Sequence, residues 1–471
     1  MPVAGRFRST RATGFGFALV VTMVRQLGHP LTAVFGAAFL TVPWLALHTA
    51  LGVDLTTGVT VALSGIAVLG ASFLLAWGAE TAEADVPRAF ALAILAVLAV
   101  APEYAMDALY AWEAGINPGS PESAEAASLA VANMTGANRI LIGIGWSAIA
   151  LFTVYRARDT GDEAVESRPG FLADVVRLDH GIATEILFLF AATVFAFFVP
   201  LGAGIGAVDM VVLVGLYVTY IFVAMNSPHE DEEQIGVPAY LQSYRKPKRI
   251  ATTLALFVFS GIVILVAVEP FAHGLEALGK SVGIPSFLMI QWVAPLASES
   301  PELIVVAYLV NKARSTAGFN ALISSKLNQW TLLIGTLVLV YSLSVGSYAP
   351  LPLDTHQMGE LWLTAAQSYF AIAILVTFSI SLREAVALLG LFLAQFVYSV
   401  TGLALTLPVP GLGAVTFDGP TSLVGFSVVY LVVGTALFVR RRRHLAAVAK
   451  LSVRRVRGDY GANETPAAVE D

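Results

Sequence analysis

Apolar segments of about 20 residues recur along the whole chain, and each is long enough to cross the roughly 30 Å hydrocarbon core of a bilayer as an α-helix. The 471 residues are 57% hydrophobic and 13% charged, with a mean hydropathy of +0.76, whereas charged residues make up about 25% of an average soluble domain. The sequence therefore predicts an all-α polytopic membrane protein with about twelve transmembrane helices. The expected spans are 29–50, 56–78, 88–112, 128–153, 180–201, 207–226, 250–271, 285–310, 317–345, 361–380, 385–406 and 421–439.

Nearly all positive charges of the loops fall on one side of the membrane when the chain is threaded from the cytoplasm, and Lys280 is the main exception. The loops 113–127, 346–360 and 407–420, on the opposite side, contain no Lys or Arg. Both termini are therefore predicted to be cytoplasmic, in a multi-pass protein of the cell membrane. The charges on the cytoplasmic side are Arg6, Arg8, Arg11, Arg25, Arg156, Arg158, Arg168, Arg177, Arg245, Lys246, Lys248, Arg249, Lys312, Arg314 and the run 440–443.

Two terminal segments allow a second interpretation. The basic leader before residues 13–24 is similar to the start of a signal peptide, but no small-x-small cleavage site follows clearly, so we expect an interfacial or packing segment. The basic run 440–444 would suit anionic lipid or nucleic acid, but after a final span it is expected to anchor the topology. No nucleic-acid partner is expected.

A Pro-Glu pair occurs twice in a similar context and indicates an internal repeat. The segment VPRAFALAILAVLAVAPEYAMDALYAW carries Pro102-Glu103, and IPSFLMIQWVAPLASESPELIVVAYLV carries Pro301-Glu302, 199 residues later. The two copies fall in the third and the eighth predicted spans, five spans apart, so they cross the membrane in opposite directions, as in the inverted repeats of secondary transporters. We expect an inverted-topology 5+5 repeat core. The predicted divisions are an N-terminus with an extra helix (1–55), a first repeat (56–226), a cytoplasmic loop (227–249), a second repeat (250–406) and an extra helix with a basic tail (407–471).

The two repeated glutamates, Glu103 and Glu302, are expected well inside the hydrocarbon layer, roughly 20 Å from one end of each helix. A buried acid is costly there unless a proton, a metal ion or a basic side chain satisfies it, which suits an antiporter. Each proline lacks the N–H that would bond the carbonyl four residues earlier, at Leu98 and Ala297, so a free carbonyl oxygen is expected beside each carboxylate. Carboxylate, carbonyl and amide oxygens form a hard ligand set that suits calcium or sodium.

Further polar residues accompany the Pro-Glu pairs. Asp107 and Glu299 each lie one helical turn from the glutamate of their own helix. If these four acids converge with the two nearby bases, Arg139 and Lys326, the formal charge of −2 matches one divalent or two monovalent cations. For the two bases, a structural ion pair and a tethered cation that replaces a mobile ion both remain open. The other candidate ligands are Ser298, Asn133, Asn138, Ser324, Ser325, Asn328 and Gln329.

These residues resemble the two α-repeats of the cation/calcium exchanger superfamily, which includes sodium/calcium and proton/calcium exchangers. Each of its repeats carries a pattern like G-T-S-x-P-E on one helix and G-N-x-x-G-S-N-x-x-N/D on the next. Here Pro102-Glu103 is followed by ANMTGAN at 132–138, and SESPE at 298–302 is followed by Ser-Ser-Lys at 324–326. The resemblance covers about 60–345 and implies that Glu103 and Glu302 are central cation ligands.

The chain departs from the family pattern at several positions. Ala99-Val100 replaces the Thr-Ser pair before the first Pro-Glu and loses two hydroxyl ligands, whereas Ser298-Glu299 adds a carboxylate to the second copy. The resemblance implies a core of ten helices, so that the first and last predicted spans are additions. The remaining departures, where the family has Asn or Asp, are Leu141, Gln329 and Lys326.

We expect a secondary active antiporter that moves calcium or a related cation against sodium or protons by alternating access. A monovalent cation/proton exchanger on the same scaffold is the alternative, and a non-transporting scaffold or an intramembrane enzyme is less favoured. The chain has no cysteine and lacks His-Glu-x-x-His, Ser/Lys and phosphate-loop motifs, so neither an enzyme nor a resident cofactor is expected. The predicted partners are inorganic cations, carried as substrate, and the lipid bilayer. The acidic run 229–233 is expected to be a solvated loop.

Overall fold

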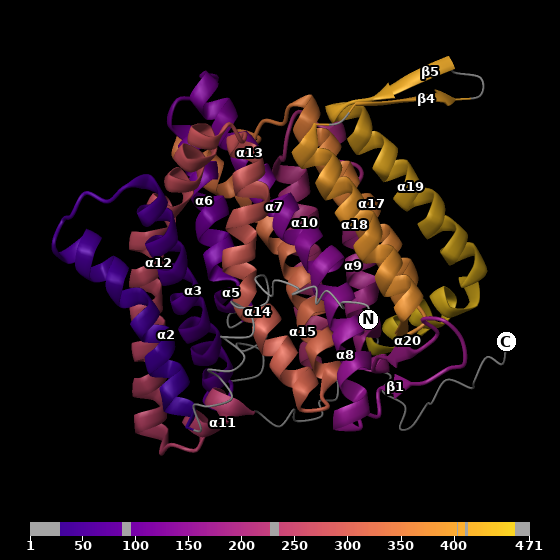
Figure 1. Ribbon diagram of the computed structural model, residues 1–471, viewed down its shortest axis with the longest axis horizontal. Helices are drawn as coiled ribbons and strands as arrows, with labels where there is room; N and C mark the ends of the chain where they lie inside the picture. The colour runs from indigo at the N-terminus through magenta and orange to yellow at the C-terminus, as the bar shows by residue number, and fades with distance from the viewer. Residues whose placement is uncertain (1–28, 87–95, 227–234, 403, 410–412, 457–471) are drawn as a thin grey trace, which may run out of the picture.

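A computed structural model describes residues 29–86, 96–226, 235–402, 404–409 and 413–456. Long helices run side by side through the described part, and a few short strands lie at their ends (Figure 1). The predicted all-α polytopic class is therefore confirmed. The basic leader, the segment 13–24 and the acidic run 229–233 lie outside the described residues.

The first half of the chain supplies the helices around the first Pro-Glu pair. Its elements are α2 (Pro30–Trp44), η1 (Leu45–Ala50), α3 (Thr57–Ala82), α5 (Ala96–Ala99), α6 (Ala101–Ile116), α7 (Pro121–Ile140), η3 (Leu141–Trp146), α8 (Ser147–Thr160), β1 (Val165–Glu166), β2 (Val175–Arg177), η4 (His180–Ile182), α9 (Ala183–Ala196), η5 (Val199–Leu201) and α10 (Ala207–Asn226).

The second half supplies the helices around the second pair and the C-terminal addition. Its elements are α11 (Gly236–Gln242), α12 (Lys246–Val282), α13 (Ser286–Leu288), η6 (Met289–Val293), α14 (Ala294–Asn311), α15 (Ser315–Asn328), η7 (Gln329–Leu333), α16 (Ile334–Val345), α17 (Thr355–Leu375), β3 (Ser379–Ser381), α18 (Leu382–Thr401), β4 (Leu405–Val409), β5 (Gly413–Phe417), α19 (Gly419–Arg440) and α20 (Arg442–Val456).

Within the described residues, ten helical segments are long and apolar enough to span a membrane. Two expected spans are not among these ten segments. The first, 88–112, lies partly outside the described residues. The second, 361–380, lies mostly in α17, whose buried polar residues Glu360 and Gln367 make the helix less apolar. The count of twelve spans and the inverted repeat therefore stay predictions. The ten segments are Pro30–Ala50, Thr57–Ala82, Pro121–Asp159, His180–Leu201, Ala207–Asn226, Lys246–Val282, Ser286–Asn311, Ser315–Val345, Leu382–Thr401 and Thr421–Arg440.

The helices pack in two groups with an apolar outer surface. One group joins α2, α3 and α12, and a second joins α9, α10 and α15 to α20, while α6 and α7 lie between them (Figure 1). On the outside, Phe35, Phe39 and Leu265 are about 70% exposed or more. Large exposed apolar side chains on long helices are typical of a surface that contacts lipid rather than water.

Two side-chain caps fix the starts of α17 and α18. The Asp354 carboxylate accepts from the Gln357 backbone N–H (2.8 Å), and the Gln357 side chain accepts from the Asp354 N–H (3.0 Å). Ser381 and Glu384 form the same reciprocal arrangement at α18. Such capping boxes satisfy backbone donors that have no partner in the first turn of a helix.

Three π-helical segments interrupt the long helices at their polar residues. The segment η3 follows Asn138 and Arg139, η7 begins at Gln329, and η6 contains Gln291. Short π-helical insertions in α-helices are frequent at functional sites. Because η3 and η7 follow the second motif of each half in the same way, they favour the predicted repeat.

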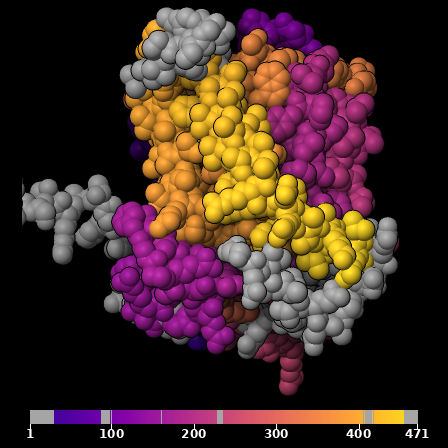
Figure 2. All heavy atoms as spheres, turned by 90° about the vertical axis from the view of Figure 1, so that its right-hand side faces the viewer, coloured from indigo at the N-terminus to yellow at the C-terminus, as the bar shows by residue number. Residues whose placement is uncertain are grey.

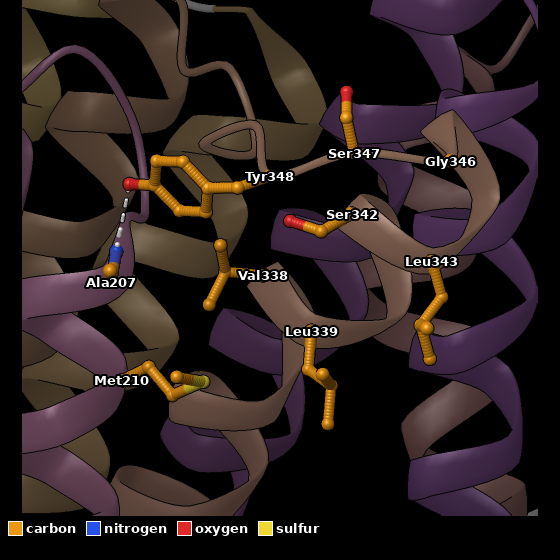
Figure 3. Close-up of a pocket in the computed structure, with 9 residues that line it drawn as sticks. All are labelled: Ala207, Met210, Val338, Leu339, Ser342, Leu343, Gly346, Ser347 and Tyr348. Carbon is orange, nitrogen blue, oxygen red and sulfur yellow. Dashed lines mark hydrogen bonds between the residues drawn. The ribbon is translucent and has the colours of Figure 1, made fainter.

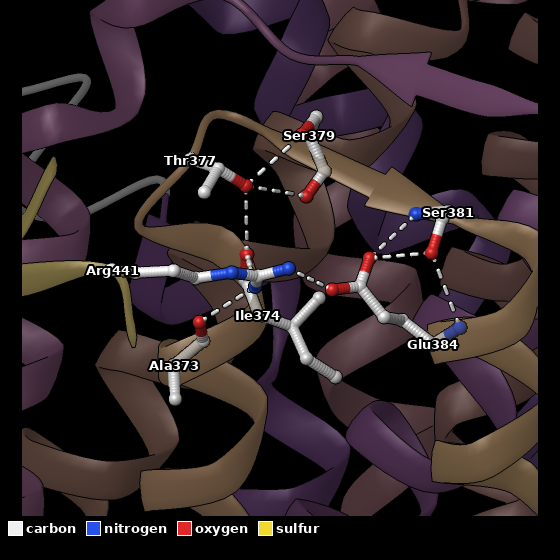
Figure 4. A network of polar contacts seen from close by, with 7 residues as sticks. All are labelled: Ala373, Ile374, Thr377, Ser379, Ser381, Glu384 and Arg441. Carbon is white, nitrogen blue, oxygen red and sulfur yellow. Dashed lines mark hydrogen bonds and ion pairs between the residues drawn. The ribbon is translucent and has the colours of Figure 1, made fainter. Parts of the chain in front are cut away.

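Helices α19 and α20 lie along the outside of the bundle (Figure 2). At their junction, Arg441 donates to the carbonyls of Ala373 (2.9 Å) and Ile374 (3.0 Å), and it forms an ion pair with Glu384 (Figure 4). One arginine of the predicted topology anchor therefore also satisfies the last carbonyls of α17 and holds the C-terminal addition against the bundle.

Short strands, which the sequence did not predict, join loops at the helix ends. Strands β1, β2 and β3 form an antiparallel sheet in which Val176 faces Ile380, so the loop before α9 is tied to the start of α18. Strands β4 and β5 form a hairpin that projects from the opposite end of the bundle (Figure 1).

Candidate cation site

The two Pro-Glu segments lie close together in the middle of the bundle. Glu103, at the start of α6, interacts electrostatically with Glu302 and Asp107. Glu299 on α14 interacts with both Glu103 and Glu302. Helix α7 packs against α6 and α14, and α15 packs against α14. The four acids that the sequence selected are therefore neighbours, as the repeat pattern predicted.

The first Pro-Glu pair does not lie in the middle of a continuous helix, in contrast to the prediction. Helix α5 ends at Ala99, Val100 leaves helical geometry (φ −106°, ψ 23°), and α6 starts at Ala101. Pro102 therefore occupies the first turn of a new helix, where its missing N–H costs no hydrogen bond. Glu103 lies at the N-terminal end of α6, and the helix dipole there favours a negative charge.

The second pair does lie inside its helix. Pro301 is an interior residue of α14, so it leaves the Ala297 carbonyl without its usual donor, as predicted. The π-helical segment before α14 brings the Gln291 carbonyl so near to Gly136 of α7 that a Cβ built on this glycine would lie 1.8 Å from the oxygen. Only glycine fits this crossing, which sets the position of α7 beside the acids.

Amides hold two of the four carboxylates. Asn133 Nδ2 donates to Asp107 Oδ1 (2.9 Å), and Gln329 Nε2 donates to Glu299 Oε1 (2.6 Å). Each of these hydrogen bonds orients one carboxylate oxygen of the acid and leaves the other oxygen of that acid without a partner. The amide side chains predicted as ligands thus also act as positioning groups.

The site contains a group of buried oxygen atoms that have no hydrogen-bond partner in the protein. A buried acceptor without a partner is costly, so each such atom needs an explanation. These atoms belong to side chains of α6, α7, η6, α14, α15 and η7, and a cation with oxygen ligands would satisfy them. They are Asp107 Oδ2, Asn133 Oδ1, Gln291 Oε1, Glu299 Oε2, Glu302 Oε2, Ser325 Oγ and Gln329 Oε1.

Hydroxyl groups lie beside both repeated glutamates. The Ser298 hydroxyl faces Glu103, and the Ser325 hydroxyl faces Glu302 without reaching hydrogen-bond geometry. Ser298 Oγ also lies 3.4 Å from the Ala294 carbonyl on its own helix. Both serines are therefore near enough to contribute an oxygen after a small side-chain rotation.

Two predicted ligands already have partners. The Asn138 side-chain oxygen accepts from Lys326 Nζ (2.6 Å), and the Asn328 oxygen accepts from the Tyr104 hydroxyl (2.7 Å). Lys326 is fully buried, and its ammonium nitrogen lies 4.2 Å from the centre of the Trp330 ring. Lys326 also interacts electrostatically with Glu299, so an amine side chain lies next to the acids.

The second predicted base pairs with an acid outside the four, so the condition for the expected charge of −2, that all six groups converge, is not met. Arg139 forms a buried ion pair with Glu360 of α17, and its guanidinium lies 4.8 Å from the centre of the Trp292 ring. With Arg139 neutralised by this fifth acid, the four acids and Lys326 carry a formal charge of −3. Of the two interpretations of Arg139, the structural ion pair is the one that this geometry favours.

In the described part of the chain, no three Asp, Glu or His side chains approach closely enough to hold a metal ion by themselves. Amide and hydroxyl oxygens must therefore complete any cation site. A separate groove of about 370 Å³ between α10 and α16 is lined mostly by apolar side chains such as Met210 and Leu339, with Tyr348 at one end (Figure 3). It offers no carboxylate, so it does not suit a cation.

The side chains of three functional candidates were not among the predicted site residues. Glu360 falls in a segment that was expected to be a loop, Tyr104 directly follows the Pro-Glu pair, and Gln291 precedes it in the second copy. Gln291 could have been found from its position two helical turns before Ser298, which places both side chains on one helix face.

A bundle of membrane-spanning helices with acids, amides and a lysine buried between two Pro-Glu segments defines a secondary transporter of small cations. The chain belongs to the sodium/calcium exchanger protein family, whose sequence pattern matches residues 56–226 and 252–401. The predicted resemblance to cation/calcium exchangers is thereby confirmed.

Two solved structures are similar to this chain. The crystal structure of the H+/Ca2+ exchanger CAX is 42% identical, with a TM-score of 0.79, and the match covers 91% of this chain and 98% of that one. The structure of native YfkE is 12% identical, with a TM-score of 0.54 over 78% of this chain and 99% of that one, and it supports the fold alone. No curated protein gives a significant match.

Proposed function

We propose that the chain exchanges calcium, or a closely related cation, for protons by alternating access at the site around Glu103 and Glu302. The observation that supports this proposal is the set of buried oxygens without protein partners on α6, α7, α14, α15 and the adjoining π segments. Seven such atoms from carboxylates, amides and a hydroxyl match the oxygen-rich coordination that calcium prefers.

Two observations favour protons over sodium as the second ion. The solved protein with 42% identity to this chain is described as an H+/Ca2+ exchanger. In addition, Ala99-Val100 stands where the family pattern has two hydroxyl residues, so the first copy lacks oxygens that a second small cation would use. A proton needs only a carboxylate.

Exchange follows from the cost of burying charge. Inside a membrane, a carboxylate group is tolerated when a proton or a bound cation offsets its charge. We propose that Glu103 and Glu302 hold either the cation or protons. The site then switches its access from one side of the membrane to the other only when a cation or protons occupy it. This condition couples the two fluxes, since an empty, fully charged site is too costly to cross.

We also propose the arrangement of the chain in the membrane. The protein lies in the plasma membrane, and its core consists of two inverted repeats, 56–226 and 250–406. One further helix is added by each terminal segment, 1–55 and 407–471. The cytoplasmic side contains both termini and the loop 227–249. The sorting of Lys and Arg between loops supports this orientation.

A second candidate function is exchange of a monovalent cation for protons. The observation that favours it is Lys326, whose ammonium group donates to Asn138 and lies beside Glu299. A tethered positive charge reduces the negative charge left for a mobile ion, and this favours a singly charged substrate.

Proteoliposomes that contain the purified chain separate these functions. With calcium inside, an imposed pH gradient should drive calcium efflux, and an equal sodium gradient should drive much less. Sodium-driven proton movement without calcium flux would select the second candidate. A correctly folded protein that moves no cation under either gradient would contradict both.

A further inference from the structure

A cavity of about 360 Å³ lies between α7, α13, α17, α18 and α19, and Pro285, Phe287 and Leu288 at the start of the second Pro-Glu segment form part of its wall. Its outer end is at the starts of α17 and α19, near the end of the bundle from which β4 and β5 project (Figure 1). His356 lines this end and is 41% exposed, whereas Glu360 and Arg139 line the inner end and are 1–2% exposed.

The inner end of the cavity contains polar atoms without protein partners. Arg139 pairs with Glu360 through Nη2, but its Nε has no acceptor. Gln395 lines the same cavity, is 3% exposed, and has an unpaired Oε1. A donor and an acceptor left unpaired at the end of a cavity that has room for on the order of ten water molecules indicate that water fills it.

A polar stripe on α17 continues this route inward. His356, Glu360, Thr364 and Gln367 follow one another at helical spacing, and the last three are buried. From His356 to Gln367 the helix rises roughly 16 Å, about half of a hydrocarbon core. Gln367 Nε2 donates to the Arg139 carbonyl (3.3 Å), so the stripe ends on α7 next to Asn138.

The wall of the cavity includes a part of the chain that lies outside the family match. Ser422, Leu423 and Phe426 of α19 line it, whereas the match ends at residue 401. The cavity is therefore built partly by the C-terminal addition of this chain, and α19 packs along α17 over much of its length.

We propose that this cavity is a water-filled half-channel that connects the β4–β5 end of the molecule to the Arg139–Glu360 pair and serves as the path of the exchanged proton on that side. The identity of the ion rests on the proposed function, but the access of water does not. The titratable and charged groups that line the path are Asp354 at the N-cap of α17, His356 and Glu360 of α17, Arg139 of α7 and Tyr398 of α18, and Tyr430 of α19 interacts with Arg139.

The absence of cysteine from the chain allows a direct test with single-cysteine variants. Ser422 and Ser427 are matched positions on α19: they are 7% and 6% exposed, and their hydroxyls donate to backbone carbonyls at 2.6 and 2.7 Å. Only Ser422 lines the cavity. A small membrane-impermeant thiol reagent, applied from the β4–β5 side, should label Ser422→Cys at least about tenfold faster than Ser427→Cys, because thiol reactivity requires access.

Equal labelling of the two variants, or labelling of Ser422→Cys from the opposite side at the same rate, would overturn the half-channel. If Ser422→Cys does not fold, Ser399→Cys on α18 replaces it, since Ser399 lines the same cavity. Gln395→Cys extends the test to the inner end, where labelling from the same side is also expected.

The role in proton movement is tested with the labelled variants. Thiol modification of Ser422→Cys in proteoliposomes should slow calcium-driven proton movement, measured with a pH-sensitive dye, by about tenfold relative to the same variant before modification. The same treatment of Ser427→Cys should change nothing. If modified Ser422→Cys moves protons at its previous rate, the cavity is not the path. If the unmodified wild type moves no protons, the proposed function fails while the labelling result still stands.

Discussion

Arg139 and Glu360 form a buried pair from residues 221 positions apart in the sequence. A repeated motif marks Glu103 and Glu302 in the sequence, whereas no motif marks Glu360. A single acid between predicted spans is usually solvated, so only its pattern with His356 and Thr364 on one helix face signals that it points inward. The residues of a site can thus be predicted when they repeat, but partners from distant helices require the fold.

The pair makes a prediction about stability. Arg139→Met leaves the Glu360 carboxylate buried without its partner, and this should lower the free energy of unfolding by about 3–5 kcal/mol. The midpoint of thermal unfolding in detergent measures the effect. Arg139→Met combined with Glu360→Met should recover most of the loss, since a well-packed apolar pair is often as stable as an ion pair. A single variant as stable as the wild type would show that the pair is not formed.

At the scale of the element, the sequence predicted the helices but not their interruptions. The break at Val100 and the π-helical segments η3, η6 and η7 depend on contacts between helices, and no local pattern encodes them. The strands β1 and β3 have two and three residues, too few for an alternating pattern. The crossing of α7 and η6 at Gly136 is a further feature that only the packed structure shows.

This crossing makes a prediction about helix packing. Gly136→Ala would place a methyl group against the Gln291 carbonyl and force the two backbones apart, at a cost of at least about 1–3 kcal/mol, and cation exchange should be lost with it. Thermal unfolding and flux in proteoliposomes measure the two effects. Gly390→Ala on α18 is the matched control, because it would meet open space and alanine is the better helix former. Equal behaviour of the two variants would argue against the close crossing.

At the scale of the whole molecule, a contact at the helix ends should make stability depend on pH. Arg249 at the start of α12 donates from Nε and Nη2 to the two oxygens of Asp85, both at 2.6 Å, and so joins the segment after α3 to α12. This bidentate pair holds the pKa of Asp85 below its usual range. A carboxyl whose pKa is lowered in the folded state stabilises the protein fully above the ordinary value of about 3.9. This stabilisation is lost progressively as the pH falls from that value through the lower pKa of the folded state.

Asp85→Asn should therefore lower the unfolding temperature at pH 7 by a few degrees, and the difference from the wild type should shrink as the pH falls below about 4. Asp159→Asn, which removes a 66% exposed partner of Arg156, should have little effect at either pH. Thermal unfolding across this pH range measures both. A wild-type advantage over Asp85→Asn that grows as the pH falls would contradict the assignment.

The whole-molecule class was predictable because lipid imposes long apolar helices, and the family was predictable because its acids sit in repeated motifs. The formal charge of the site was not predictable from the sequence, because it depends on which acid the Arg139 side chain contacts. Everything in the proposed mechanism depends on Glu103 and Glu302 as the groups that hold the exchanged cation.

Calcium uptake driven by a pH gradient, measured with radioactive calcium in proteoliposomes, tests this claim most directly. Glu103→Gln and Glu302→Gln keep the shape of each side chain and remove its charge, so each should reduce uptake by about 100-fold or more. Glu125→Gln, which removes a 50% exposed acid paired with Lys280, should transport like the wild type. Uptake near the wild-type rate in both Glu103→Gln and Glu302→Gln, with Glu125→Gln unchanged, would contradict the account.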